Sequence, residues 1–269
     1  MTAGLAPIRS MTYARMVQGQ GWRTGLLHDR PDNVLIWITR GQGRVVINGI
    51  RRGMGTHNAL WLPAGRLWSI DPGPQSLAQV VISPAGLTGR LPKEPLHLRV
   101  RDSLGQAELT GHIEAMQREM SQNRPLLQEA LEAHVRLIAV WLWRQQAAGA
   151  ADAPEDTAGH RLVRRFVRDV VAGPPGDRPV AAYAAALEVT PTHLTRACRA
   201  ACGKSANQIL TERRLHAAQV LLGQPTPPIQ NVARHLGFHS PAYFTRFIRS
   251  HTGKAPSVLR RALRQAAPE

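Results

Sequence analysis

The sequence predicts an α+β protein in which a small antiparallel β-barrel is followed by helices. Short β-branched or apolar runs, separated by glycine, proline and asparagine, occupy residues 34–83. Apolar residues recur at helical spacing over residues 104–147 and again after residue 160. Basic charge gathers in the second half, because residues 160–269 contain 17 Lys and Arg against 5 acids, whereas residues 1–159 contain 17 against 13.

The composition predicts a two-domain, cytosolic protein that binds a polyanion. At 269 residues and 43% apolar content, the chain is long enough for two cores. The net charge of +16 favours nucleic acid over membrane, because no basic segment carries a large exposed apolar face. The chain has no apolar run of about 18 residues and no signal-peptide pattern. The two cysteines, Cys198 and Cys202, are read as partly buried helix residues rather than as a redox sensor.

Six strands are predicted in the first half, at Val34–Thr39, Arg44–Ile47, Ile50–Arg52, Ala59–Leu62, Leu67–Ile70 and Leu77–Ser83. One more is expected within Met11–Met16, in an otherwise irregular start. Asn48-Gly49 lies between two of these runs and indicates a two-residue hairpin turn, which requires positive φ at both positions. Strands this short and closely spaced form a small barrel or sandwich.

A barrel of this size can hold a small ligand inside it. The tryptophans near its strands are interpreted as core in preference to a ligand cage, and they are Trp22, Trp37, Trp61 and Trp68. An inward arginine would suit a carboxylate, but alternation does not select one among Arg23, Arg40, Arg51, Arg52 and Arg66. His28 and His57 are interpreted as surface or hydrogen-bonded histidines, so no metal and no cofactor is predicted.

Residues 104–122 and 125–147 are predicted to form a helical hairpin, with the break marked by Pro125. Its apolar surface needs a partner. That partner is either a second copy of the chain or the chain's own barrel. Residues 148–159 then turn to Ala, Gly, Asp, Glu, Pro and Thr, which is typical of a linker.

Two helix-turn-helix units are predicted after the linker. In the first, a helix over 160–171 precedes a short helix over 180–187, and Thr190-Pro191 begins a helix that ends at Gly203. In the second, a helix beginning near Ile229 ends at Gly237, and Ser240-Pro241 begins the next. Thr195-Arg196 aligns with Thr245-Arg246 fifty residues later. A helix over 205–222 connects the units as a rigid spacer.

The segment HLGFHSPAYFTRFIRSHTGKAPSVLRR, at residues 235–261, resembles the signature of the AraC/XylS family of transcription regulators. The residues in register are Gly237, Phe238, Tyr243, Phe244, Arg246, Phe247, Gly253 and Pro256. Ile248-Arg249 departs from the family's usual types but keeps their apolar and basic character. An ordinary helical hairpin within an enzyme is the alternative interpretation.

The resemblance implies four segments: a cupin-like sensor domain (1–103), a dimerising hairpin (104–147), a linker (148–159) and an AraC-type DNA-binding domain (160–269). The sensor resemblance rests on glycine-punctuated strands and on Leu62-Pro63-Ala64-Gly65. In metal cupins a ligand histidine soon follows that phrase, whereas this chain has Leu67-Trp68-Ser69. A metal-dependent enzyme is therefore not expected.

By the same resemblance, two helices face DNA, through Thr192, Thr195, Arg196 and Arg199 and through Ala242, Tyr243, Thr245, Arg246 and Arg249. Arg196 and Arg246 are predicted to contact bases, since arginine bridges guanine O6 and N7. Phosphate contacts are predicted for His193, Arg199, Lys204, His239 and Arg249. For Tyr243, partial core packing is the favoured interpretation.

The predicted function is a sequence-specific transcription regulator, an activator that responds to a small-molecule effector, with RNA polymerase and a second copy of the chain as protein partners. A repressor of the same family is the first alternative. A metal-free cupin enzyme with a DNA-binding appendage and a non-specific architectural DNA protein are the others. No catalytic residues are predicted, because residues 1–103 contain no paired carboxylates, nucleophile elbow or metal cluster.

Overall fold

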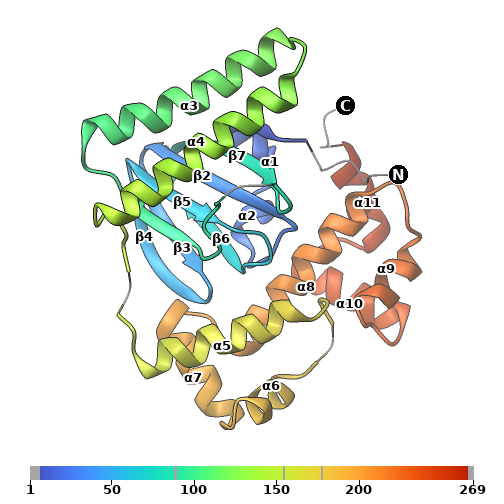
Figure 1. Cartoon of the computed structure of the whole chain (residues 1–269). Helices are drawn as coiled ribbons and strands as arrows, with labels where there is room; N and C mark the ends of the chain where they lie inside the picture. Colours follow the sequence, from blue (N-terminus) through green and yellow to red (C-terminus); the bar gives the residue numbers. More distant parts are fainter. Residues whose placement is uncertain (1–6, 88–89, 154, 177, 266–269) are drawn as a thin grey trace.

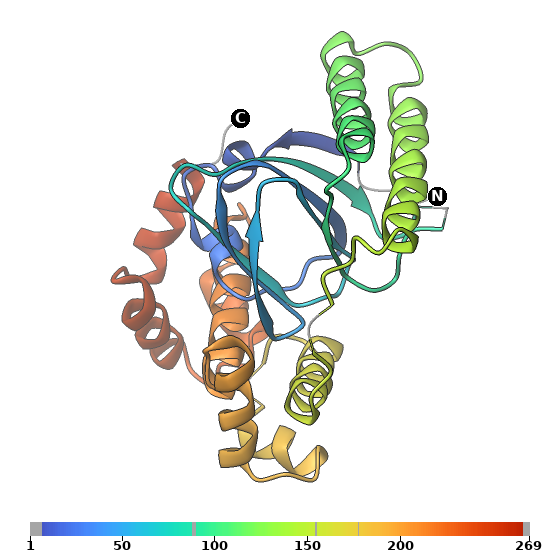
Figure 2. The same cartoon turned by 90° about the vertical axis from the view of Figure 1, so that its left-hand side faces the viewer.

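The computed structural model describes residues 7–87, 90–153, 155–176 and 178–265 and has the predicted α+β class. Two antiparallel sheets form the centre of the molecule (Figure 1). A helical hairpin lies on one side of them, and the C-terminal helices lie on the other. Figure 2 shows the sheets curving around each other like an open barrel.

The larger sheet has the strand order β1-β7-β2-β5-β8, with strands at Arg9–Thr12, Leu77–Pro84, Asp32–Arg40, Asn58–Leu62 and Leu96–Arg99. The smaller sheet has the order β4-β3-β6, with strands at Ile50–Gly55, Gln42–Ile47 and Trp68–Pro72. Asn48 and Gly49 join β3 to β4 with φ of 49° and 77°, so the predicted hairpin turn is confirmed.

Both faces of the larger sheet are buried. Leu35, Trp37 and Val81 face the helical hairpin, whereas Val34 and Ile36 face the smaller sheet. Strands buried on both faces read as continuous apolar runs. The interpretation of the tryptophans as core is confirmed for Trp37, Trp61 and Trp68. Trp22 is different, because it is partly exposed and packs against the C-terminal helices.

The N-terminal region corrects the sequence prediction. The strand expected within Met11–Met16 is β1, which ends at Thr12. The Thr12 hydroxyl then accepts a hydrogen bond from the Arg15 amide and caps a short helix, α1 (Tyr13–Val17). A second short helix, α2 (Trp22–Gly25), follows. Strand β8 was missed, because its four residues are too few to show a period.

The hairpin consists of α3 (Ser103–Gln122) and α4 (Leu127–Ala147) and packs on the chain's own sheet. Leu109, Ile113 and Leu142 lie in that contact. Leu104, in the first turn of α3, is 70% exposed. The outer side of α4 also leaves apolar side chains in solvent, at Leu137, Val140 and Trp143.

The predicted linker is partly fixed to the barrel. Ala150 and Asp152 lie beside β8, where the Arg99 amide donates to the Ala150 carbonyl and the Asp152 amide donates to the His97 carbonyl. The Asp152 carboxylate also lies 3.2 Å from Nδ1 of the buried His97. The connection to the C-terminal helices therefore starts from a held position.

Seven helices form the described C-terminal part, namely α5 (Ala158–Ala172), α6 (Val180–Ala186), α7 (Pro191–Cys202), α8 (Ala206–Gly223), α9 (Ile229–His235), α10 (Pro241–Thr252) and α11 (Pro256–Gln265). Helices α5 to α7 pack on the N-terminal half of α8 through Ala206 and Ile209. Helices α9 to α11 pack on its C-terminal half through Leu215, Ala218 and Leu222. Among the helices described, none is long and apolar enough to cross a membrane.

Candidate nucleic-acid interface

Helices α7 and α10 are copies of one structural unit, fifty residues apart. Each has 12 residues and begins with proline. The hydroxyls of Thr190 and Ser240 accept hydrogen bonds of 3.1 Å from the amides of His193 and Tyr243, so each helix has the same N-cap. Both end at a glycine, Gly203 or Gly253, with φ of 77° or 71°.

The same positions of the two helices face inward and outward. Leu194 and Phe244 are fully buried, as are Cys198 and Ile248 one turn later. On the opposite face, the arginines at both repeat positions are exposed, at Arg196, Arg199, Arg246 and Arg249. Burial raises the pKa of the Cys198 thiol to about 12, as expected for a packing residue rather than a thiolate sensor.

Each of these helices follows a short helix across a tight turn. Gly237 has φ of 74° in the turn from α9 to α10, and Glu188 has φ of 58° in the turn from α6 to α7. A left-handed conformation costs a residue with Cβ roughly 1–2 kcal/mol. The two units therefore share backbone geometry, although only the second has glycine at this turn.

The two arginines predicted to read bases keep their charge in solvent. Nη2 of Arg196 lies 3.3 Å from Nδ1 of His193 on the same helix. The guanidinium of Arg246 lies 5.8 Å from the ring centroid of Tyr243. Neither contact is an ion pair. Both side chains are thus available to an anionic or acceptor-rich partner.

Residues 183–262 match a protein-family model described as a helix-turn-helix domain. This range begins within α6 and contains α7 to α10, with the caps and the exposed arginines of α7 and α10. This part of the chain is an AraC-type helix-turn-helix domain. The chain is accordingly a DNA-binding transcription regulator. No curated protein sequence matches it significantly.

Solved structures with a similar chain course include two regulators. ToxT from Vibrio cholerae, with an unsaturated fatty acid bound, is 13% identical, with a TM-score of 0.44 over 98% of this chain and 96% of that one. A DNA-binding transcriptional dual regulator from Escherichia coli K-12 is 24% identical, with a TM-score of 0.35 over 42% of this chain and 99% of that one.

Within the AraC-type domain, most of the predicted contact residues lie on the exposed faces of α7 and α10. Thr192, His193, His239, Ala242 and Thr245 are exposed, and Thr195 is partly exposed. Tyr243 packs on Phe238, with a ring separation of 5.7 Å, but remains 50% exposed. Its core-packing interpretation is therefore only half right.

Lys204 lies elsewhere. It follows α7, and its ammonium is 2.5 Å from the Glu212 carboxylate of α8. It lines a hollow of about 330 Å³ together with Arg44 and Arg51 of the barrel. The equivalent residue of the second unit, Lys254, is exposed and was not singled out from the sequence.

The spacer helix α8 is also the surface to which the N-terminal part of the chain is attached. Arg213 is 5% exposed and donates to both carboxylate oxygens of Asp29, at 2.6 and 3.1 Å. It also donates to the carbonyls of Val170 and Gly173, at 2.6 and 3.0 Å. The Leu27 amide donates to Glu212. This junction was missed, because its partners are about 185 residues apart.

One turn later, two neutral histidines stack across the same junction. The rings of His28 and His216 are 4.0 Å apart and nearly parallel. Burial lowers the pKa of His216 to about 4, and burial followed by the His216 charge lowers the pKa of His28 well below its usual value. The His28 Nδ1 lies 2.8 Å from the Leu26 carbonyl. His28 is therefore hydrogen-bonded as predicted, but buried, whereas His57 is exposed.

Replacing Arg213 should destabilise the protein strongly. Arg213→Leu leaves the Asp29 carboxylate and two carbonyls without their donor, and breaking a buried pair from one side costs about 3–5 kcal/mol. We expect a loss of about 3 kcal/mol in the free energy of unfolding, measured in urea. The control Arg161→Leu removes an ion pair with Asp156 that is more than half exposed, and it should change stability by less than about 0.5 kcal/mol. Equal losses of stability in both variants would contradict a special contribution of the buried Arg213–Asp29 pair.

Acid should weaken the junction. A histidine whose pKa is lower in the folded state binds more protons when unfolded, so its contribution to stability is complete above about pH 6.5 and falls as the pH drops toward 4. For His216 the full loss is about 3 kcal/mol. His216→Gln should flatten the dependence of unfolding free energy on pH between 6.5 and 4, and His57→Gln should leave it unchanged. If the unfolding free energy of His216→Gln falls with pH as steeply as that of the unchanged protein, His216 is not the source of the acid sensitivity.

Proposed function

We propose that the protein is an effector-responsive transcription activator that reads two successive major grooves, one with α7 and one with α10. The observation that carries the proposal is the duplication of a capped helix with exposed arginines at equivalent positions, on the two halves of one helix. With 18 residues, α8 is about 27 Å long. That length is of the order of one DNA turn, which separates successive major grooves by about 34 Å.

In this proposal, Arg196 and Arg246 read base edges, because they occupy the same place in both units and face solvent. Thr192, Thr195, Ala242 and Thr245 surround them as small groups that fit beside a thymine methyl or a phosphate. Phosphate contacts come from His193 and Arg199 on α7, from Arg249 on α10, and from His239 and Lys254, which flank α10. Lys204 joins them only where the barrel and Glu212 release it.

The sensor domain controls DNA reading through α8. Residues 23–29 hold one side of this helix through Asp29, Leu27 and the Arg23 carbonyl, which is 3.1 Å from Nε2 of His216. An effector that binds one arrangement of sensor and α8 better than another shifts the population of chains able to span both grooves. The effector therefore needs no contact with DNA.

The proposal includes a homodimer, since the outer side of α4 exposes Leu137 and a paired protein matches a paired site. Activation takes place in the cytoplasm through contact with RNA polymerase at a neighbouring promoter. Transcription in a purified system distinguishes activation from repression. The template carries a binding site, selected from random DNA, upstream of a promoter. Output that falls when protein is added would assign repression instead.

Base reading by Arg196 and Arg246 is tested by binding titrations on a site selected from random DNA and on single-base variants of it. Arg196→Ala and Arg246→Ala should each remove about 1–3 kcal/mol of discrimination at the positions read by their own unit. The control, Lys254→Ala, should weaken all sequences alike and reduce the salt slope by about one unit. Uniform losses with both arginine variants would refute base reading.

A further inference from the structure

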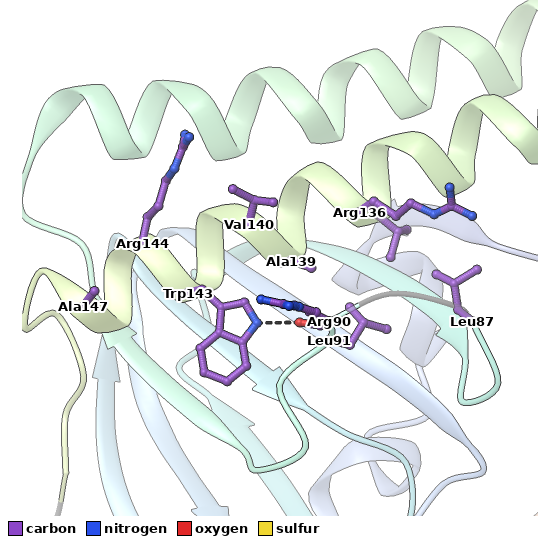
Figure 3. A pocket seen from close by; sticks show the side chains of 10 residues that line it. Leu87, Arg90, Leu91, Arg136, Ala139, Val140, Trp143, Arg144 and Ala147 are labelled. Carbon is purple, nitrogen blue, oxygen red and sulfur yellow. Dashed lines mark hydrogen bonds between the residues drawn. The ribbon is translucent and has the colours of Figure 1, made fainter.

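A groove of about 750 Å³ lies between α4 and the residues Leu87, Arg90 and Leu91, which follow β7 (Figure 3). It is on the side of the sensor domain away from the AraC-type domain. Its lining is largely apolar and includes Leu87, Leu91, Val135 and Trp143. The Trp143 indole N–H donates to the Arg90 carbonyl, drawn as a dashed line in Figure 3. This bond attaches one wall of the groove to α4.

The polar side chains of the lining are all cationic. They are Arg90, Arg136 and Arg144, and no acid belongs to the described part of the lining. Figure 3 shows Arg90 beside Trp143 and Arg136 extending toward Leu87, whereas Arg144 points away from the groove. Arg136 also lies 3.4 Å from Glu132, in a pair whose arginine is 55% exposed. Such an exposed pair contributes little and is readily exchanged for another carboxylate.

From this arrangement we infer that the groove binds an amphipathic organic anion, with its apolar body against Leu87, Leu91 and Trp143 and its acid group paired with Arg90 or Arg136 at the edge of the groove. Apolar walls with a few polar groups are typical of small-molecule sites. Arginine matches the planar, two-oxygen geometry of an acid group. The inference rests on the proposed effector response and gives the effector a chemical class and a place.

A second copy of the chain fits this groove less well. A two-fold interface places the same patch on both sides. Arg90 and Arg136 of one copy would then share a small interface with the same two arginines of the other. Like charges brought together at an interface cost several kcal/mol. A small anion instead neutralises the groove, so the charge pattern favours it over a second copy.

The test uses two fluorescent probes that share an aromatic body, 8-anilinonaphthalene-1-sulfonate and the uncharged N-phenyl-1-naphthylamine, titrated into the full-length protein. The double variant Arg90→Gln/Arg136→Gln should weaken binding of the sulfonate at least tenfold and leave the uncharged probe within twofold. The matched control Arg118→Gln, at an exposed position of α3, should leave both affinities unchanged.

Each other outcome overturns the inference. Absent sulfonate binding, or sulfonate binding that the double variant does not weaken, shows that the anion site is not this groove. An equal loss for both probes shows that the arginines shape the groove without reading charge. A dimer in sedimentation equilibrium that the sulfonate dissociates puts a second copy there instead. The titration contains no DNA, so failure of base reading by Arg196 and Arg246 leaves its result unaffected.

Discussion

The structure depends on the polar face of α8. Arg213, His216 and Gln219 are each less than 9% exposed on a helix whose other buried residues are apolar. Buried polar groups are costly unless they are hydrogen-bonded, and a buried charge is costly unless it is paired. Residues 23–29 supply the Asp29 carboxylate to Arg213 and the Arg23 carbonyl to His216, and the carbonyls of Val170 and Gly173 complete the partners of Arg213. Because both helix-turn-helix units also pack on α8, one helix sets the geometry of these units and the position of the N-terminal part.

The two units are not held equally. The first shares a core with the barrel, in which Val46, Ile50 and Leu67 pack with α5 and α7. At the β3–β4 turn, a Cβ on Gly49 would come within 2.5 Å of Val163 on α5. The second unit meets the N-terminal part of the chain mainly through the partly buried Trp22 and Leu26. A change in the barrel therefore acts first on the unit that carries Arg196.

Local signals predicted the recognition helices well. The bounds of α7 and the start of α10 follow from a hydroxyl cap and a proline, which act over three or four residues. The signature around Gly237 was likewise legible in the sequence. The first unit was harder to recognise, because its turn has Glu188 in a conformation typical of glycine. The choice of Arg196 and Arg246 as base readers stays a prediction that their exposure supports.

The features that sequence reading missed depend on distant partners. Arg213 and His216 look like surface residues of a spacer helix until Asp29 and His28 are placed beside them. Lys204 resembles its copy Lys254 in sequence, and only the nearby barrel makes their surroundings differ. The strands of the larger sheet are buried on both faces, so apolar and polar residues do not alternate along them. The sequence therefore did not show which side chains face the smaller sheet and which face the helical hairpin.

A ligand in the α4 groove has a continuous packed route to the DNA-binding helices. Helix α4 rests on the outer face of the larger sheet. The inner face of that sheet packs on the smaller one, and the β3–β4 turn of the smaller sheet contacts α5. Close-packed layers have few voids in which to absorb a displacement, so they move as units or not at all. A shift of α4 therefore reaches α5 through two sheets, whereas the junction at Arg213 meets α8 directly. An effector in the groove and a proton at His216 would thus act on two different helices of the C-terminal part.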